Sequence, residues 1–147
     1  MQLDPRARRC VVEALAAYCQ GLFLGCASML GAASEGAWYV AGEQLRHLDA
    51  RLARALDGDN IVTVMNRISE VLRQTRTLRI TVDELRAQAA LLRQLRNYGV
   101  HPRSDHLERY FTDSGAAILL METHTYLGRL TDAVSTCLTD HDESAEE

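Results

Sequence analysis

Residues 81–102 of this chain read TVDELRAQAALLRQLRNYGVHP. The apolar residues Leu85, Ala89 and Leu92 are spaced by four and three positions, as on one face of an α-helix. Arg93 is offset from this face, as expected for a surface charge. The segment therefore predicts an amphipathic helix that packs one side against the rest of the chain.

Both ends of this helix carry recognisable signals. Thr81 and Glu84 have the spacing of a capping box, which opens a helix. Gly99 suits the position after the last helical turn, and Pro102 cannot continue a helix. We therefore expect the helix to end near Tyr98 and a loop to follow as far as about residue 112.

The same helical period predicts four further helices. They are expected at residues 5–20, from about 22 to 56, 61–78 and 113–138. The turn at residues 57–60 is the clearest break, and no internal repeat or linker divides the chain. The prediction is an all-α, up-and-down helical bundle of about five helices in one domain, residues 1–138. The acidic residues 139–147 are expected to form a disordered tail.

The first half of the second predicted helix is crowded with glycine, alanine and serine. Glycine lowers helix propensity by roughly 1 kcal/mol per residue, so this composition predicts that another backbone packs closely there. Glu35 lies in the middle of the patch. It is expected on the surface or in an ion pair, and Arg96 across the bundle is one possible partner.

Composition excludes several classes of protein. Apolar residues make up 47% and charged residues 24%, the ordinary globular balance. The longest apolar stretch, 22–33, is about half of the ~20 residues that a membrane span needs. The four cysteines form no CxxC pair and have no histidine at ligand spacing, so buried thiols in a reducing compartment are expected. The predictions are a cytoplasmic protein, no membrane contact and no metal site.

Charge is unevenly distributed along the chain. The net charge is −4, and all 16 basic residues are arginine, which biased codon usage explains. Residues 73–109 hold eight arginines and four acids, whereas residues 139–147 carry −5. The basic excess therefore surrounds the end of the helix that opens at Thr81.

Arg96 continues the apolar face of that helix, four positions after Leu92. A guanidinium at such a position needs an anion or acceptor opposite it. His101 follows five positions later, but an arginine followed by a histidine at four to six positions is expected about 1.6 times by chance in this composition. An ordinary helix end with a loop histidine therefore competes with an active site. Asn97, directly after the arginine, adds weight to the second interpretation.

The run Arg96-Asn97-Tyr98-Gly99-Val100-His101 resembles the signature of the HEPN superfamily, the higher eukaryotes and prokaryotes nucleotide-binding domains. That signature is an arginine, commonly followed by a polar residue, with a histidine after four to six positions. The predicted helices and Glu35 are compatible with such a domain. The resemblance implies a metal-independent endoribonuclease or RNA-binding domain that acts as a homodimer, in the context of a toxin or defence effector. An antitoxin or another protein partner would fit this context.

By this resemblance Arg96, Asn97 and His101 are the catalytic residues. His101 would take a proton from a ribose 2′-hydroxyl, and Arg96 would stabilise the charged phosphate. Tyr98, Arg93 and Arg103 are the predicted substrate-binding residues, and no metal or cofactor is needed. Some toxin members carry a tyrosine two places after the histidine, where this chain has Arg103.

Two other interpretations stay open. The first is a catalytically inactive HEPN-like bundle that acts as a dimerisation or protein-interaction module. The second is an unrelated helical bundle whose motif arises by chance. The second is favoured if Arg96 forms an ion pair within its own bundle and His101 points to solvent. A solvent-open basic cleft beside His101, shared by two chains, would favour the ribonuclease.

Overall fold

A computed structural model describes residues 5–98 and 105–145, all of them in helices or short connections, with no strand within these ranges. The α-helices are α1 Pro5–Cys19, α2 Phe23–Leu45, α3 Ala50–Gly58, α4 Ile61–Leu72, α5 Arg79–Tyr98 and α6 Asp113–Ala145. Three short 3₁₀ helices connect them: η1 Arg46–Leu48, η2 Arg76–Leu78 and η3 Asp105–Tyr110. The predicted all-α helical bundle is confirmed, with six α-helices in the described part of the chain in place of about five.

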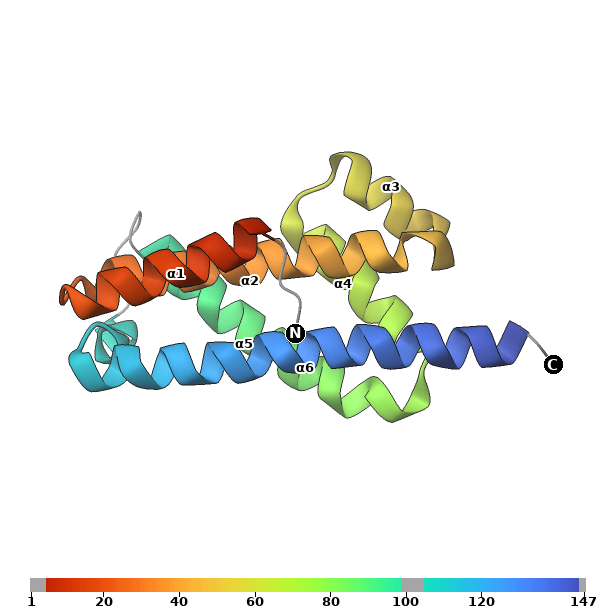
Figure 1. The fold of residues 1–147 in the computed structure, drawn as a ribbon. Coiled ribbons are helices and arrows are strands. Elements are labelled where there is room, and N and C mark those ends of the chain that lie inside the picture. The colour runs from red at the N-terminus through yellow and green to blue at the C-terminus, as the bar shows by residue number, and fades with distance from the viewer. Residues whose placement is uncertain (1–4, 99–104, 146–147) are drawn as a thin grey trace.

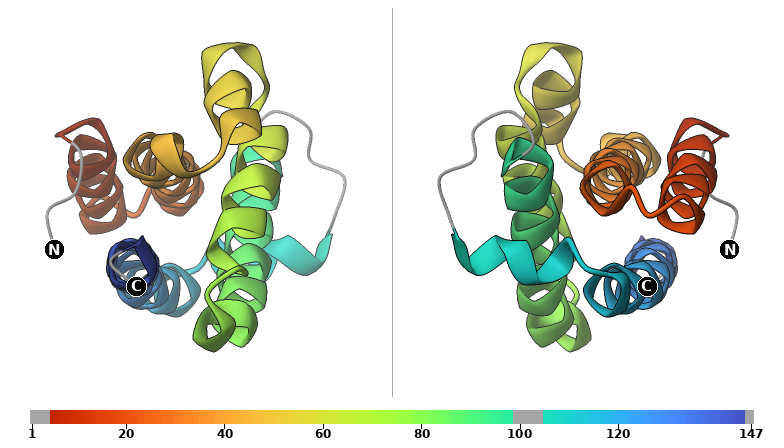
Figure 2. Two further views of the ribbon diagram at one scale, coloured as in Figure 1. Left: turned by 90° about the vertical axis from the view of Figure 1, so that its right-hand side faces the viewer. Right: turned by 90° about the vertical axis from the view of Figure 1, so that its left-hand side faces the viewer.

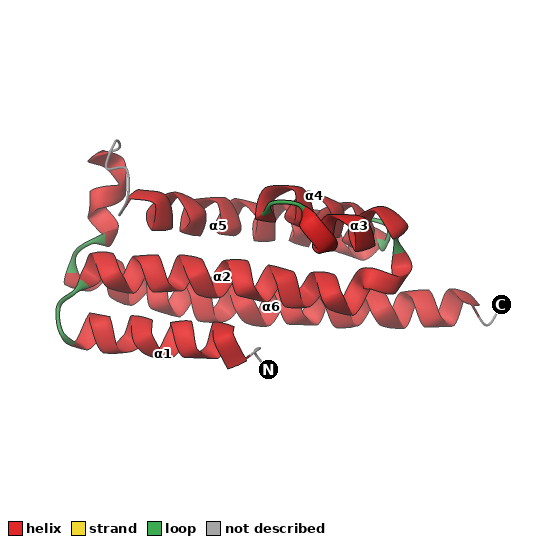
Figure 3. Ribbon diagram, turned by 90° about the horizontal axis from the view of Figure 1, so that it is seen from above, coloured by secondary structure: helices red, strands yellow, loops and turns green. Residues whose placement is uncertain are grey.

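α2 is the central helix of the bundle. It packs against α1 on one side and against α4 and α5 on the other, while α6 lies along both α1 and α2 (Figures 1 and 2). Its residues Trp38 and Leu45 are fully buried. α6 extends beyond the end of α2, as the view from above shows (Figure 3). No helix of residues 5–98 or 105–145 is long and apolar enough to cross a membrane.

The first helix ends where the sequence predicted. Gly21 has φ +72°, and its amide donates to the Tyr18 carbonyl at 2.9 Å. The Leu22 amide donates to the Ala17 carbonyl at 2.8 Å. This pair of bonds closes a helix with a glycine in the left-handed region, and it turns the chain directly into α2.

The prediction of one continuous helix from about 22 to 56 is wrong. The chain leaves the helix after Leu45, and α3 begins at Ala50. Asp49 is extended, with φ −147° and ψ 121°, and its side chain accepts hydrogen bonds from the Arg51 and Leu52 amides. An aspartate in this conformation is a helix N-cap, so the break arises at a residue that lies inside an apparently unbroken helical pattern.

The boundary between α4 and α5 also differs from the prediction. α4 ends at Leu72, six residues early, and α5 begins at Arg79, which places Thr81 and Glu84 inside the helix. The predicted capping box therefore does not start α5. Thr75 is buried, and its hydroxyl donates to an Asp140 carboxylate oxygen of α6 at 3.1 Å. Thr75 therefore contacts α6 from the segment 73–78, which lies between the end of α4 and the start of α5.

α6 is longer than expected and includes most of the acidic segment. The prediction of a disordered tail at 139–147 does not describe residues 139–145, which form the last turns of α6. Asp140 anchors these turns through its hydrogen bond to Thr75. The predicted loop at 98–112 contains the short helix η3.

Two of the cysteine predictions are confirmed and two are wrong. Cys26 and Cys137 are buried, whereas Cys10 is half-buried and Cys19 is exposed, and all four thiols are free. Burial raises the pKa of the Cys26 thiol to about 11. The exposed Cys19 is the last residue of α1.

Candidate functional site

The crossing of α2 and α5 positions the arginine of the motif. A Cβ placed on Gly31 of α2 would lie 2.7 Å from the Leu92 carbonyl oxygen and 2.7 Å from Arg96 Cβ. No side chain larger than hydrogen fits at this point without moving the α5 backbone. The small-residue patch is therefore a close helix crossing, as predicted, and it brings Arg96 onto the surface of α2.

Arg96 forms an ion pair with Glu35, one turn further along α2. Arg96 Nη1 lies 2.5 Å from Glu35 Oε2. The Arg96 side chain is 46% exposed, whereas the Glu35 side chain is 17% exposed. The other carboxylate oxygen, Glu35 Oε1, is buried and has no hydrogen-bond partner. The pair thus joins a half-exposed cation to an anion that is mostly covered by protein.

The predicted need of Arg96 for an anion is met by Glu35. Leu85, Ala89 and Leu92 are buried as expected, but Arg96 itself is exposed rather than inward-facing. An ion pair within the same bundle is one of the two features expected of an unrelated bundle with a chance motif. The other feature concerns His101, which lies outside the described residues.

Arg93 lies one turn before Arg96 on α5 and is half-buried. Its Nη1 atom is buried and has no hydrogen-bond partner. No anion of the described residues forms an ion pair with it. Asn97, the next residue after Arg96, is exposed. This end of α5 therefore presents two arginines and an amide side chain, with one carboxylate against them.

Tyr98 is engaged by the protein rather than free for a substrate. Its ring lies 4.9 Å, centroid to centroid, from the ring of Phe111. Its hydroxyl donates to Glu108 Oε1 of η3 at 3.1 Å. In this arrangement Tyr98 connects the end of α5 to the segment that precedes α6. A stacking role for Tyr98 would require these contacts to open.

His101 and Arg103, two of the predicted site residues, lie outside the described residues, as do Gly99 and Pro102. The structure therefore brings together Arg96 and Glu35, with Arg93 three positions before Arg96 on α5, and the position of the histidine lies outside its description. Of the other histidines, His124 is exposed, because Thr123 and Tyr126 occupy the inward positions of that part of α6.

The described residues contain no group of three or more histidine, cysteine, aspartate or glutamate side chains that could hold a metal ion. The arrangement at the end of α5 suits an anion instead. Guanidinium groups bind phosphate oxygens through paired N–H donors. Arg96 uses Nη1 for Glu35, which leaves its other nitrogens available to such a ligand.

Comparison with known proteins adds nothing to this site. No family model matches the sequence, no curated protein matches it, and no solved structure matches the fold. The resemblance to the HEPN superfamily therefore depends on the run from Arg96 to His101 and on the order of the helices.

Proposed function

We propose that this chain is a HEPN-like domain that binds RNA and cleaves it without a metal ion. The observation that carries the proposal is the exposure of the Arg96 side chain, which is 46% exposed although Nη1 pairs with Glu35, at the end of α5 and five positions before His101 in the sequence. The basic excess of residues 73–109 supports binding of a polyanion. A well-oriented cation is what transition-state stabilisation of a phosphate requires.

The reaction would follow from the residue chemistry. His101, neutral near pH 7, takes the proton of a ribose 2′-hydroxyl, and the 2′-oxygen attacks the adjacent phosphorus. The bond from phosphorus to the 5′-oxygen breaks, and that oxygen receives a proton. The products are a 2′,3′-cyclic phosphate and a 5′-hydroxyl, so DNA is not a substrate. Arg96 binds the phosphate, with Arg93 and Arg103 as further cations and Asn97 as an orienting amide.

A homodimer would supply the second proton-transfer group, since one histidine cannot readily serve as base and acid in the same step. The partner's His101 is then the acid that protonates the leaving oxygen. A cytoplasmic toxin or defence effector, held inactive by an antitoxin or another protein, is the biological context that we propose for this activity.

A catalytically inactive interaction module is the second candidate. Arg96 already has a carboxylate partner within its own chain, which lowers its net attraction for a phosphate. On α1, Val12 and Leu15 are 59% and 52% exposed, although they are apolar. Because Val12 and Leu15 are three positions apart, they lie side by side on the helix, and a protein partner of the interaction module would cover them.

The deciding experiment is cleavage of a mixed RNA pool in EDTA. The wild type is compared with His101→Ala and Arg96→Ala at matched folding and oligomeric state. His47→Ala and Arg54→Ala are the matched controls, because both residues are exposed on the surface far along the chain from the motif.

The proposal predicts that cleavage survives chelation, leaves 2′,3′-cyclic phosphate ends and is lost only in the two motif variants. A folded dimer that neither binds nor cleaves RNA would favour the interaction module. Cleavage that persists in both motif variants would show that other residues carry the reaction.

A further inference from the structure

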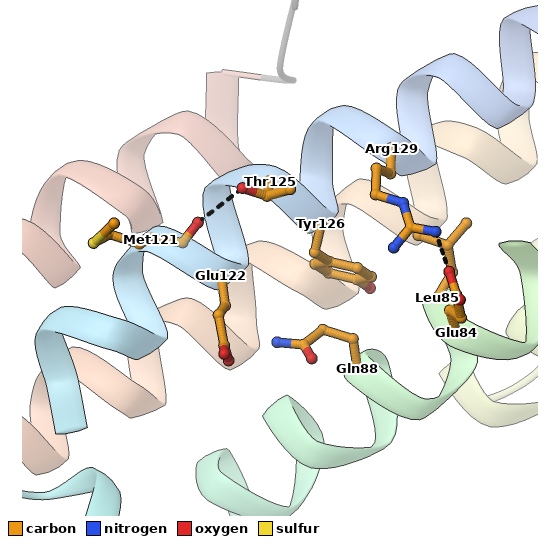
Figure 4. A pocket seen from close by; sticks show the side chains of 8 residues that line it. All are labelled: Glu84, Leu85, Gln88, Met121, Glu122, Thr125, Tyr126 and Arg129. Atoms are coloured by element: carbon orange, nitrogen blue, oxygen red, sulfur yellow. Dashed lines mark hydrogen bonds and ion pairs between the residues drawn. The ribbon is translucent and has the colours of Figure 1, made fainter.

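A groove of about 510 Å³ lies between α5 and α6, on the side of α5 occupied by Gln88. Figure 4 shows Glu84, Leu85 and Gln88 of α5 facing Glu122, Tyr126 and Arg129 of α6, whereas the Met121 side chain is directed away from α5. Its size is within the range of sites that bind small organic ligands or short peptide segments. None of these residues belongs to the Arg96–His101 motif, so the groove is a separate feature of the molecule.

The wall formed by Tyr126 offers an apolar ring rather than a free hydroxyl. Trp38 Nε1 donates to the Tyr126 hydroxyl at 2.5 Å, and Ser34 Oγ lies 2.8 Å from the same oxygen. Burial raises the pKa of Tyr126 to about 12, so the phenol is neutral. Since its polar end is used inside the bundle and Tyr126 is only 4% exposed, Tyr126 offers the groove only the edge of its ring.

The charges of the groove do not cancel. Glu84 and Arg129 form an ion pair across one end (Figure 4). Glu122 is exposed and has no ion pair with any described residue. The lining therefore carries two carboxylates and one guanidinium, a net charge of −1. This balance disfavours phosphates and other anions and favours a cation placed against Glu122.

Gln88 contributes an uncharged hydrogen-bond donor to the groove. Its Nε2 atom is buried and lacks a hydrogen-bond acceptor. Figure 4 shows its amide directed toward Glu122, from the opposite side of the groove. A buried donor without an acceptor is unfavourable, because it has lost its hydrogen bonds to water. A ligand that brings a carbonyl oxygen to this place would remove that cost.

We propose that the α5–α6 groove binds an arginine side chain of a peptide, with the guanidinium on Glu122 and a neighbouring peptide carbonyl on Gln88. A planar guanidinium pairs with a carboxylate through two parallel N–H bonds. The aliphatic part of the arginine lies along the exposed edge of the Tyr126 ring. This binding site goes beyond the proposed ribonuclease and does not depend on it.

The test is an NMR titration of the full chain with four small probes. Acetyl-arginine N-methylamide carries both groups that the site recognises, and agmatine carries the guanidinium without the carbonyl. Acetyl-citrulline N-methylamide is the neutral isostere, and uridine represents a nucleobase ligand. Amide shifts of residues 84–88 and 121–129 report binding at the groove.

The arginine derivative is expected to shift these amides with millimolar affinity and to bind roughly tenfold more tightly than the citrulline derivative. Glu122→Gln should reduce its affinity by a similar factor. Gln88→Leu should reduce the affinity for the arginine derivative to that for agmatine. The affinity for agmatine itself should not change in this variant. Asp132→Asn and Gln94→Leu, at exposed positions of the same two helices, are the matched controls and should leave all affinities unchanged.

Three results would overturn the proposal. The first is the absence of shifts at the groove with the arginine derivative. The second is equal binding of the arginine and citrulline derivatives, because the carboxylate would then have no role. The third is uridine binding at the same amides, insensitive to Glu122→Gln, which would identify a nucleobase site instead. The spectra of the variants themselves report whether each one is folded.

Discussion

Arg96 Nη1 on α5 lies 2.5 Å from Glu35 Oε2 on α2, directly beside the point where Gly31 lets the two helices touch. The ion pair and the close crossing depend on each other. The crossing sets the distance between the two side chains, and the pair fixes the direction of the guanidinium. Both can be tested separately from any activity.

Gly31→Ala should destabilise the protein by about 1–3 kcal/mol, because the new methyl group meets the Leu92 carbonyl and Arg96 Cβ. The control is Gly25→Ala in the same helix, where the nearest side-chain atom would be 3.7 Å away. That control should be neutral or stabilising by up to about 1 kcal/mol through helix propensity. Urea denaturation measures both, and equal stabilities would show that the helices do not cross this closely.

Glu35→Gln should change the unfolding free energy by less than about 1 kcal/mol, since Arg96 is nearly half exposed and such pairs are weak. If Glu35 positions Arg96 for catalysis, kcat for RNA cleavage should fall about tenfold or more. The control is Glu43→Gln on α2, which breaks the exposed pair of Glu43 with Arg46 of η1. An unchanged kcat in Glu35→Gln would remove Glu35 from the mechanism.

Tyr126→Phe should cost about 1–3 kcal/mol, because it leaves the buried Trp38 indole N–H without its acceptor. Tyr39→Phe, at a 39% exposed tyrosine of α2, should be nearly neutral. Thermal unfolding followed by circular dichroism compares the two. Similar melting temperatures for both variants would contradict the proposed cost of the missing bond.

Stability should decrease at alkaline pH. Burial raises the folded pKa of Cys26 from 9.0 to about 11 and that of Tyr126 from 10.0 to about 12. Between these values the unfolded chain releases protons that the folded chain keeps, so the unfolding free energy falls as pH rises from about 9 to 12. Urea midpoints across this range test whether stability falls as pH rises. Cys26→Ala should remove the fall in unfolding free energy that begins near pH 9.

Asp49→Ala should destabilise α3 by about 1 kcal/mol, because the Arg51 and Leu52 amides lose their cap. The hydrogen bond from the Leu52 amide lowers the pKa of Asp49 below its usual 3.8. Its contribution to stability is therefore present above pH 3.8 and is lost as pH falls through the folded pKa. Asp59→Ala, an exposed residue after the same helix, serves as the control. Acid denaturation curves that coincide for the two variants would argue against the cap.

The helices themselves were largely predictable from local pattern. Leu85, Ala89 and Leu92 are all buried, as their spacing indicated. The break after Leu45 was not predictable in this way, because Leu45, Leu48 and Leu52 keep the helical period across it. An N-cap depends on the backbone conformation of one residue, and the period of apolar residues does not report that conformation. Local pattern also did not predict the helical structure of residues 139–145. These residues are anchored by Thr75, which is distant in the sequence.

The sequence alone indicated that Arg96 departs from an apolar pattern, and it predicted an anion opposite this arginine, because a guanidinium among other helices is unfavourable without one. Only the tertiary structure decided which anion. Glu35 is 61 residues away, and the register in which α5 crosses α2 at Gly31 selects it. The groove between α5 and α6 has the same origin, since Gln88 and Glu122 share no local pattern and meet only because both helices pack on α2. Local spacing specifies which face of a helix is buried, and the packing of side chains between helices specifies which residues meet.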